Sequence, residues 1–539
     1  MNREGDRSMR HVLIALLVAG LLGAAPAVLS APAPAPQAGG TLVFGGEVDP
    51  DRLDPNLSGL RNSQIVFFQI FEPLIVRDPK DGQFKPWLAT GWDVSSDGRA
   101  YTFRLRRDVR FHDGTPFNAA AVKFNMDRTH NPALATRCAG CAVGFYDGAD
   151  VIDPSTVRIR LKGPWAPFLD AMSLFYRMAS PTAVEKFGDA EFGRNPVGTG
   201  PFRFVEWIPN NRVVLDRNPD YNWAPAIFNH RGPAYLERVV FRFIPEPSTR
   251  VAALEAGEAQ VILLPPPQEF ARLVRDPRFR PLIGRTPGVP LTFAINTTKE
   301  PTNELAVRRA LNLGIDREII ARAVYRPYQG LDAFLPAFTV LSPTTWGYDK
   351  STEIYEYDPD RARTILEEAG WRPGPDGFRV KGGQRLEVNL VHSEHGVPEV
   401  MQSQLRRIGV NLRINVVDIL TANEAQRKGQ SHMSPVPAAR TDPDILSVLL
   451  HSRNVGVGFN FAFVKDPVLD RLLDEGAVEV DVARRRRIYV QLVRHVMERA
   501  YMLPVHTRDI ASMLAAAVTD FRYDVTGAFP WMYDTWIRR

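Results

Sequence analysis

The sequence predicts an α/β protein of two or three domains, with a β-rich first part followed by alternating strands and helices. In the first third of the 539-residue chain, apolar residues alternate around turn signals, as expected for antiparallel hairpins. From about residue 286 the pattern changes to strand–helix–strand, which is typical of a parallel sheet with a right-handed crossover. The length exceeds what a single hydrophobic core holds.

The N-terminus has the parts of a secretory signal peptide. Three arginines precede an uncharged apolar run at 12–25, and small residues follow. The run is too short to span a bilayer readily, and a retained N-terminal anchor is the alternative. We expect residues 1–30 to be cleaved and 31–38 to form an Ala/Pro linker. Since no lipid-attachment cysteine follows, the protein is expected in the periplasm and not as a lipoprotein.

The charge pattern gives no sign of a nucleic-acid partner. The formal net charge is +5 and no lysine-rich block is present. The only basic run is Arg484 to Arg487. Apolar residues follow it at helical spacing, so we expect these arginines to begin an amphipathic helix and to face water.

The β-rich part begins with a short strand at 41–45. Alternating apolar residues at 92–94 and 101–105 flank Asp97-Gly98, a strong hairpin signal. Asn118 then has the position of a helix N-cap. Another alternating strand follows at 157–161.

In the second part, Asp358 and Pro359 predict the start of a helix that Gly370 ends. Leu386, Val388 and Leu390 then alternate as a strand. A helix over 397–408, ending at Gly409, and a strand over 410–416 complete the strand–helix–strand unit.

The two cysteines, Cys138 and Cys141, stand in a Cys-Ala-Gly-Cys sequence. A reactive dithiol is one interpretation of this spacing. However, no thioredoxin-like context surrounds it, and no second pair completes a zinc site. In an oxidising compartment we expect a small structural disulfide between them.

Motifs for catalysis are absent from the sequence. There is no Gly-x-Ser-x-Gly elbow, no His-Glu-x-x-His helix and no phosphate-cradling loop. His392, Glu394 and His395 follow a strand closely enough for a metal site, but ordinary polar loop residues explain them more simply. We therefore predict no catalytic residues, no metal and no cofactor.

Ten segments in sequence order resemble the dipeptide/oligopeptide/nickel class (family 5) of extracytoplasmic solute-binding proteins that serve ABC importers. The most specific are Ile70-Phe-Glu-Pro-Leu-Ile and Lys85-Pro-Trp-Leu-Ala-Thr-Gly-Trp. The segments are 39–45, 53–55, 70–75, 85–92, 101–106, 109–118, 195–202, 217–221, 307–317 and 442–446. Together they extend over nearly the whole mature chain.

The resemblance implies a two-lobed periplasmic-binding-protein clamshell of the large type II class, with an extra β-rich subdomain in the N-terminal lobe. Lobe I would comprise 39–75, 195–285 and 505–539, with 76–194 as the inserted subdomain, and lobe II would comprise 286–504. Closure of the lobes about a hinge would then enclose a ligand.

The resemblance also places the ligand at loops that follow strand ends between the lobes. The residues expected to bind it are Ser58, Gly59, Leu60, Arg61, Asn62, Leu264, Phe293, His392, Glu394, His395, Met433, Val436, Ala439 and Arg440. Peptide binders of the family use an aspartate where this chain has Ala439. Arg440 suits an anionic group, because its planar fork bonds both oxygens of a carboxylate. Equally, Arg440 could pair with Asp442 or face solvent.

The expected function is to capture a small solute, a peptide or a peptide-like molecule, for import. The partners would be an ABC permease with its cytoplasmic ATPase subunits, and the protein itself would be a monomer. A secreted hydrolase and a periplasmic peptide-binding chaperone are the alternatives. The fold does not choose among dipeptides, longer peptides, sugars, opines, haem and nickel chelates.

Overall fold

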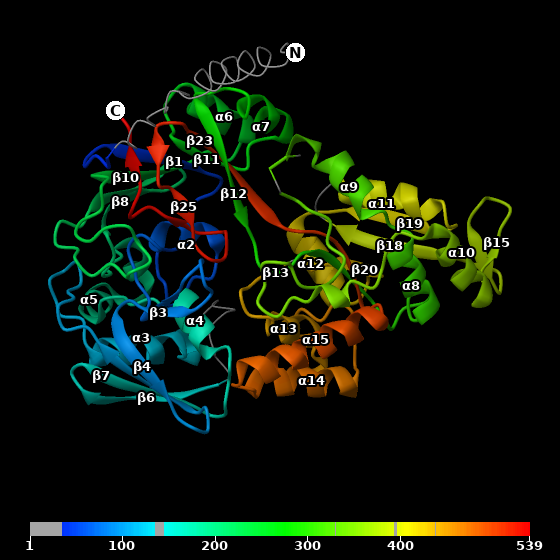
Figure 1. Ribbon diagram of the computed structural model, residues 1–539, viewed down its shortest axis with the longest axis horizontal. Helices are drawn as coiled ribbons and strands as arrows, with labels where there is room; N and C mark the ends of the chain where they lie inside the picture. Colours follow the sequence, from blue (N-terminus) through cyan, green and yellow to red (C-terminus); the bar gives the residue numbers. More distant parts are fainter. Residues whose placement is uncertain (1–34, 135–144, 329, 332, 393–395, 437) are drawn as a thin grey trace, which may run out of the picture.

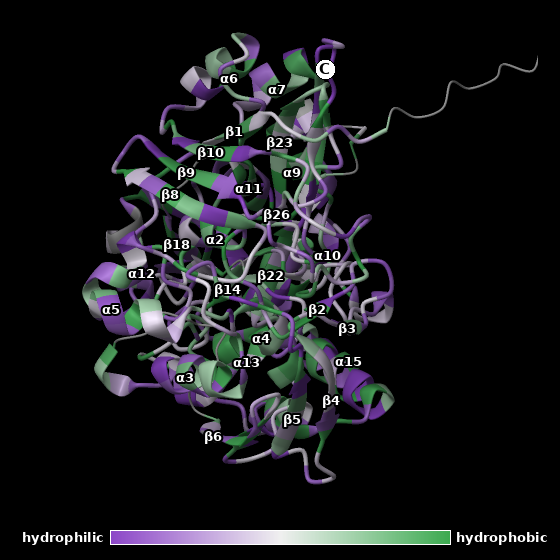
Figure 2. Cartoon of the chain, turned by 90° about the vertical axis from the view of Figure 1, so that its left-hand side faces the viewer, coloured by the Kyte–Doolittle hydropathy of each residue, from purple (hydrophilic) through white to green (hydrophobic). Residues whose placement is uncertain are grey.

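The computed structural model describes residues 35–134, 145–328, 330–331, 333–392, 396–436 and 438–539. These residues form two lobes, with the second lobe drawn in yellow and orange beside the first (Figure 1). Strand β12 runs toward the second lobe, and β23, which pairs antiparallel with it, returns to the first lobe (Figure 1). Hydrophobic residues follow the strands inside the lobes, whereas hydrophilic residues cover much of α5 and α15 (Figure 2). The predicted cysteine pair, together with Glu394 and His395, lies outside the described residues.

A seven-stranded sheet forms the centre of the first lobe. Its order is β12 (Phe279–Arg285), β23 (Asp509–Ala515), β11 (Val261–Leu263), β1 (Thr41–Gly46), β10 (Arg238–Phe243), β9 (Arg212–Arg217) and β8 (Phe202–Ile208). Strand β1 pairs in parallel with both β10 and β11, whereas the outer strands pair antiparallel. The strand predicted at 41–45 is therefore confirmed as the middle strand of this sheet.

A four-stranded antiparallel sheet forms a separate layer of the first lobe, as the alternating apolar residues predict. Its order is β4 (Ala89–Val94), β5 (Ala100–Leu105), β7 (Thr156–Leu161) and β6 (Tyr146–Asp153). Helices α3 (Ala119–Thr129), α4 (Phe168–Leu174) and α5 (Pro181–Glu191) belong to the same part of the chain. The predicted N-cap is confirmed, because the Asn118 side chain accepts a hydrogen bond from the amide of Ala121.

The buried carboxyl group of Glu72 joins Trp87, just before β4, to the loops before β8 and after β9. Glu72 is 0% exposed and accepts hydrogen bonds from the side chains of Trp87, Thr199, Tyr221 and Trp223 at 2.5–2.9 Å. These donors come from segments far apart in the sequence, including several that carry the family resemblance. The side chains in these segments donate the hydrogen bonds that satisfy one buried carboxyl group.

The second lobe contains a five-stranded sheet in the order β19 (Asn411–Val416), β18 (Glu387–His392), β20 (Met433–Pro435), β14 (Leu291–Ile295) and β22 (Met502–His506). Strands β18 and β19 are parallel and joined by α11 (Val397–Arg406), so the predicted crossover unit is confirmed. Helix α10 (Pro359–Glu368) begins at Asp358, whose side chain accepts from the amide of Arg361.

Helices α14 (Pro467–Val478) and α15 (Val482–Glu498) pack together beside this sheet. The prediction that Arg484 to Arg487 all face water is wrong for one of the four. Arg485 is 6% exposed, and its guanidinium donates to both carboxylate oxygens of Asp442 at 2.6 and 2.7 Å. One arginine of the run thus lies on the buried face of α15, beside Tyr489.

Two chain crossings join the lobes, one between β12 and β14 and the other between β22 and β23. They touch where the amide of Thr286 donates to the carbonyl of Arg508 at 3.3 Å. Strand β13 (Gly288–Val289) follows the first crossing and pairs with β21 (Ala438–Ala439). Gly288 has a φ of +102°, and an added Cβ would lie 2.1 Å from the carbonyl oxygen of Ala438. Glycine is therefore required at this crossing.

Tyr328 and Phe334 make a further, non-covalent bridge between the lobes. The amide of Phe334 donates to the Asp509 carboxylate at 2.5 Å. The side chains of Tyr328 and Phe334 pack in an apolar cluster with residues of α6 (Pro247–Glu255), α7 (Pro267–Leu273) and β23. Residues assigned to lobe II from the sequence thus share a core with lobe I. The lobe limits given above remain a proposal.

The other regular elements are short or lie outside the sheets described so far. They are α2 (Arg61–Phe67), α8 (Leu305–Leu313), α9 (Arg317–Val324), α12 (Ile419–Arg427), α13 (Ile445–Leu450), β2 (Ile75–Arg77), β3 (Phe84–Pro86), β15 (Arg372–Pro373), β16 (Arg379–Lys381), β17 (Gln384–Arg385), β24 (Val518–Thr519), β25 (Arg522–Tyr523), β26 (Pro530–Trp531) and β27 (Trp536–Ile537). Among the described residues, no helix has both the length and the apolar character to cross a membrane.

Candidate functional site

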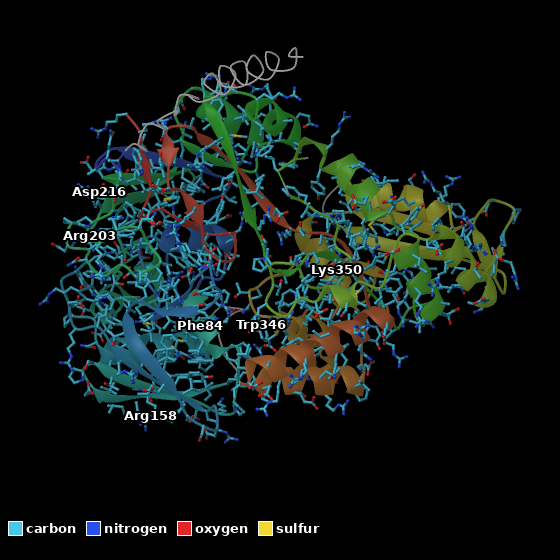
Figure 3. The ribbon with its side chains drawn as sticks, in the orientation of Figure 1. Phe84, Arg158, Arg203, Asp216, Trp346 and Lys350 are labelled. Carbon is cyan, nitrogen blue, oxygen red and sulfur yellow. The ribbon has the colours of Figure 1, made fainter. Side chains whose placement is uncertain are left out.

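A cavity of about 790 Å³ lies between the inserted subdomain and the second lobe. Its first wall comes from the β2–β3 hairpin, the β4–β5 hairpin and α4. Its second wall comes from residues 344–346, Thr441, Asp442, the α14–α15 turn and the start of α15. Val525 of the C-terminal segment also lines the cavity. Phe84 and Trp346 lie on opposite sides of this space (Figure 3). The volume falls in the range of about 300–1,000 Å³ that is typical of small-molecule sites.

The charged side chains that line this cavity form ion pairs with one another or with close neighbours. Arg77 pairs with Asp170 at 3.0 Å, and its guanidinium also lies 4.4 Å from the centre of the Phe84 ring. Arg485 pairs with Asp442 at 2.6 Å and lies 5.1 Å from the Trp346 ring. Asp81 pairs with Lys85, and Glu479 pairs with Arg484.

Three contacts hold the two walls together at the cavity. The amide of Ala166 donates to the carbonyl of Ala477 at 2.8 Å. The hydroxyl of Thr441 donates to the carboxylate of Asp170. The guanidinium of Arg440 lies 4.6 Å from the centre of the Phe175 ring. The inserted subdomain supplies one partner and the second lobe the other in each contact, so the structure has its lobes closed at this position.

Burial and neighbouring charges shift the pKa values of the ionisable groups at this contact. Burial raises the pKa of Asp170, with a further contribution from Asp442. Burial and Asp442 also raise the pKa of Asp444 to about 6. Burial acts in the same direction on Asp442, but Arg485 outweighs it and lowers the pKa of that carboxyl group. Burial lowers the pKa of Arg440, whose neighbouring charges are Asp170, Asp444 and Asp442.

The residues expected to bind ligand from lobe I lie at the start of α2 and directly after β11. Arg61 pairs with Glu47, directly after β1, at 2.5 Å. Leu264, directly after β11, has a strained φ of +45°, and its carbonyl accepts from Arg250 at 3.2 Å. Ser58 is buried and donates to Asp51. Gly59 and Asn62 are half-buried, and Leu60 is exposed. None of the residues 58–62 or 264 lines the cavity described above.

Those expected from lobe II divide between its core and its surface. Phe293 and Met433 are both 0% exposed, and Val436 is 4% exposed; all three pack in the core of the second lobe. Phe293 in β14 and Met433 in β20 are buried within the sheet, and a ligand contact at these positions remains a prediction. His392, at the end of β18, is also buried.

Ala439 and Arg440 lie next to the chain crossing. Ala439 is exposed and pairs with Gly288, and the amide of Arg440 donates to the carbonyl of Pro287 at 3.1 Å. The sequence left two alternatives for Arg440, a pair with Asp442 or exposure to solvent. The geometry does not favour the pair, because Arg485 donates to both oxygens of that carboxylate. Arg440 is half-buried against Phe175 instead of facing solvent fully.

Sequence reasoning missed most residues that line the cavity. Phe84 lies in a two-strand hairpin, and Trp346 lies in an irregular loop, where no periodic pattern marks a site. One signal was present between α14 and α15: the alternating sequence Val478-Glu-Val-Asp-Val482. Val480 and Val482 remain 53% and 65% exposed, and both line the cavity. Contiguous exposed apolar surface is typical of binding sites.

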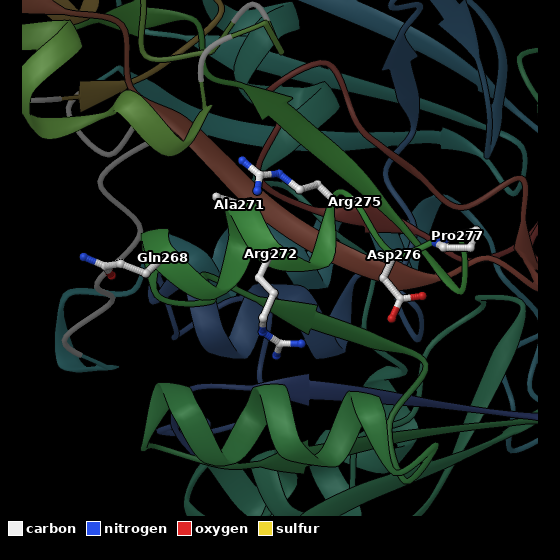
Figure 4. A pocket seen from close by; sticks show the side chains of 6 residues that line it. All are labelled: Gln268, Ala271, Arg272, Arg275, Asp276 and Pro277. Atoms are coloured by element: carbon white, nitrogen blue, oxygen red, sulfur yellow. The ribbon is translucent and has the colours of Figure 1, made fainter.

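Another concavity lies on the outer side of the first lobe, around α7 (Figure 4). Its lining comes from one helix and the turn after it, including Arg272, Arg275 and Asp276. Arg272 pairs with Glu255 and Glu269 in exposed ion pairs, which contribute little binding energy. In the part of the chain that the structure describes, no three His, Cys, Asp or Glu side chains gather in a way that could hold a metal ion.

Comparison with known proteins agrees with this architecture. The chain is 32% identical over 480 residues to the glutathione-binding protein GsiB of Salmonella choleraesuis (strain SC-B67), covering 87% of this chain and 89% of that protein. Its structure resembles NikA from Brucella suis in complex with Fe(III)-EDTA, with a TM-score of 0.82, 26% identity and coverage of 93% and 100% of the two chains.

A dipeptide binding protein from Pseudoalteromonas sp. SM9913, in complex with Met-Leu, gives a TM-score of 0.76 at 25% identity and covers 93% of this chain and 100% of that chain. Residues 83–454 match the family described as bacterial extracellular solute-binding proteins, family 5. The two-lobed clamshell with its inserted subdomain is thereby explained, and the chain belongs to the bacterial extracellular solute-binding proteins of family 5.

Proposed function

We propose that this protein captures a peptide or peptide-like solute between its lobes and delivers it to an ABC permease for import. The solute-binding role follows from the family. The ligand class is supported by relatives named for glutathione and for a dipeptide. The permease, with its cytoplasmic ATPase subunits, would be the protein partner.

The observation that carries this proposal is the cavity of about 790 Å³ whose walls belong to different lobes. A ligand there contacts both walls at once, so its binding energy favours the closed arrangement over an open one. The two chain crossings provide the connection about which the lobes would turn.

A binding role suits the geometry better than hydrolysis. The carboxylates at the cavity, Asp170 and Asp442, are held by Arg77 and Arg485. Arg485 donates to both oxygens of Asp442 and lowers the pKa of that carboxyl group, which weakens it as a general base. A chaperone for unfolded segments would need a larger apolar surface than this cavity provides.

The remaining expectations are part of the same proposal. The protein would be exported through a cleaved signal peptide, would not be a lipoprotein and would act as a periplasmic monomer. Cys138 and Cys141 would form a disulfide. The loops after β1, β11 and β18, together with Ala439 and Arg440, would contact the parts of the ligand that extend toward the hinge.

Native mass spectrometry of protein purified from a periplasmic extract tests the proposal. We expect a fraction of the protein to carry one solute of small mass, which titration calorimetry with peptides then reproduces as saturable 1:1 binding. Peptide recovered in cleaved form, or failure of all peptides, opines, sugars and metal chelates to bind, would contradict a receptor role.

A further inference from the structure

The cavity between the lobes is lined by charged side chains that form ion pairs and by exposed apolar side chains. Two of its ion pairs, Arg77–Asp170 and Arg485–Asp442, are mostly buried. Its other two acids are in more exposed pairs, Asp81 with Lys85 and Glu479 with Arg484. In the two buried pairs, each arginine also covers an aromatic ring, Phe84 or Trp346. A charged ligand group entering this space would have to compete with an existing partner at short range. Such competition costs binding energy, because breaking a buried pair leaves one charge uncompensated.

The rim of the same cavity exposes apolar side chains from both lobes. Val94 belongs to β4 of the inserted subdomain and is 44% exposed, whereas Val480 and Val482 precede and begin α15 and are 53% and 65% exposed. The two sides approach closely, since a Cβ added to Gly98 would lie 3.5 Å from Val480. Apolar surface that both lobes direct into one space gains free energy when a ligand removes it from water.

We infer that this cavity is a subsite for an uncharged apolar group of the ligand, an aromatic or branched aliphatic side chain. The inference rests on the proposed function for the identity of the whole ligand, but it assigns the group that enters between the β4–β5 hairpin and the α14–α15 turn. The walls that receive the group are Phe84 and Val94 on one side, and Trp346 and Val480 on the other.

Two measurements test the inference separately from the proposed function. The first uses N-phenyl-1-naphthylamine, an uncharged aromatic probe whose fluorescence rises in apolar surroundings. We expect saturable binding to the wild type and a loss of about tenfold or more in affinity for Val480→Asp, because a carboxylate replaces apolar surface. Val478→Asp is the matched control: Val478 is similarly exposed but lies outside the cavity, so its affinity should stay within about twofold.

The second measurement compares the tripeptides Ala-Phe-Ala, Ala-Leu-Ala, Ala-Asp-Ala and Ala-Lys-Ala by titration calorimetry. We expect the Phe and Leu peptides to bind about ten- to a hundredfold more tightly than the charged ones. In Val480→Asp the order should shift toward Ala-Lys-Ala, a gain that an unfolded variant would not produce.

The outcomes separate the two claims. Probe binding that Val480→Asp abolishes, without binding of any peptide, would support the apolar subsite and contradict the peptide ligand. Probe binding that is absent, or unchanged in Val480→Asp, would overturn the subsite, as would tight binding of peptides with a preference for the Asp or Lys side chain.

Discussion

At the scale of single residues, buried ionisable groups are stabilised by specific hydrogen-bond and ion-pair partners. Arg485 and Glu72 show two different solutions. The guanidinium of Arg485 neutralises Asp442 through a bidentate pair and donates its remaining Nε–H to the carbonyl of Gly476 at 2.8 Å. The carboxyl group of Glu72 has no cationic partner among its hydrogen bonds and is held by four neutral donors.

Replacing Arg485 by methionine should destabilise the second lobe strongly. The substitution keeps most of the side-chain volume but leaves the buried Asp442 carboxylate without its cation, a situation that costs about 3–5 kcal/mol. Urea unfolding followed by tryptophan fluorescence measures the loss. The control is Arg487→Met, because Arg487 is exposed on the same helix and should change stability by less than about 0.5 kcal/mol. Equal effects of the two variants would contradict the pairing.

Glu72 should make the stability of the protein depend on pH. Burial raises its pKa from 4.5 to about 7, against the effect of its hydrogen bonds. Between these values the unfolded chain has lost the proton and the folded chain keeps it, so unfolding releases a proton and stability falls as pH rises. The loss from pH 4.5 to 7 is roughly 3 kcal/mol at 1.36 kcal/mol per unit.

The measurement is the free energy of unfolding from pH 4 to 8 for the wild type and Glu72→Gln. The difference between the two proteins should change across this window and level off above pH 7. A constant difference would show that folding leaves the pKa of Glu72 at its ordinary value and would contradict this prediction.

At the scale of elements, short-range sequence patterns predicted most of what the structure contains. The hairpin at Asp97-Gly98, the helix caps at Asn118 and Asp358 and the crossover unit at 386–416 are confirmed. Caps and hairpins depend on a few adjacent residues, so a short segment of sequence is enough to predict them. The buried position of Arg485 could not be predicted, because it depends on Asp442, which is brought to α15 only by tertiary packing.

The candidate site was predicted less well for the same reason. Leu264 directly follows β11 and His392 ends β18, whereas Phe293 and Met433 are core residues. Apolar residues in a buried strand and in a ligand wall have the same composition, so the sequence does not separate them. The cavity walls come from elements that touch only after the lobes have folded and closed.

The β13–β21 pair is the element on which the first chain crossing depends. Gly288→Ala should separate these strands, because its Cβ would meet the carbonyl oxygen of Ala438 and its φ of +102° disfavours a side chain. We expect a loss of about 2 kcal/mol or more in stability. Gly377→Ala, with a φ of +84° but open space around it, should cost only about 1 kcal/mol. Thermal unfolding of both variants gives the comparison, and equal costs would exclude the steric contact.

On the scale of the whole molecule, the lobes are linked at both ends of the space between them. At the hinge, the two chain crossings, together with Tyr328 and Phe334, connect them. At the far end, Ala166 bonds to Ala477 and Thr441 bonds to Asp170. The cavity lies at this far end, where rotation about a hinge moves the walls most. A ligand held there contacts both walls only in the closed arrangement, so its binding favours closure.

Hydrogen exchange measured by mass spectrometry, with and without the tightest-binding tripeptide, tests the central claim that the ligand binds between the lobes. We predict that saturating ligand slows amide exchange in both walls together, in residues 79–101 of the inserted subdomain and in residues 344–346, 441–442 and 479–485 of the second lobe. Slower exchange confined to one lobe, or located around α7 instead, would contradict the account.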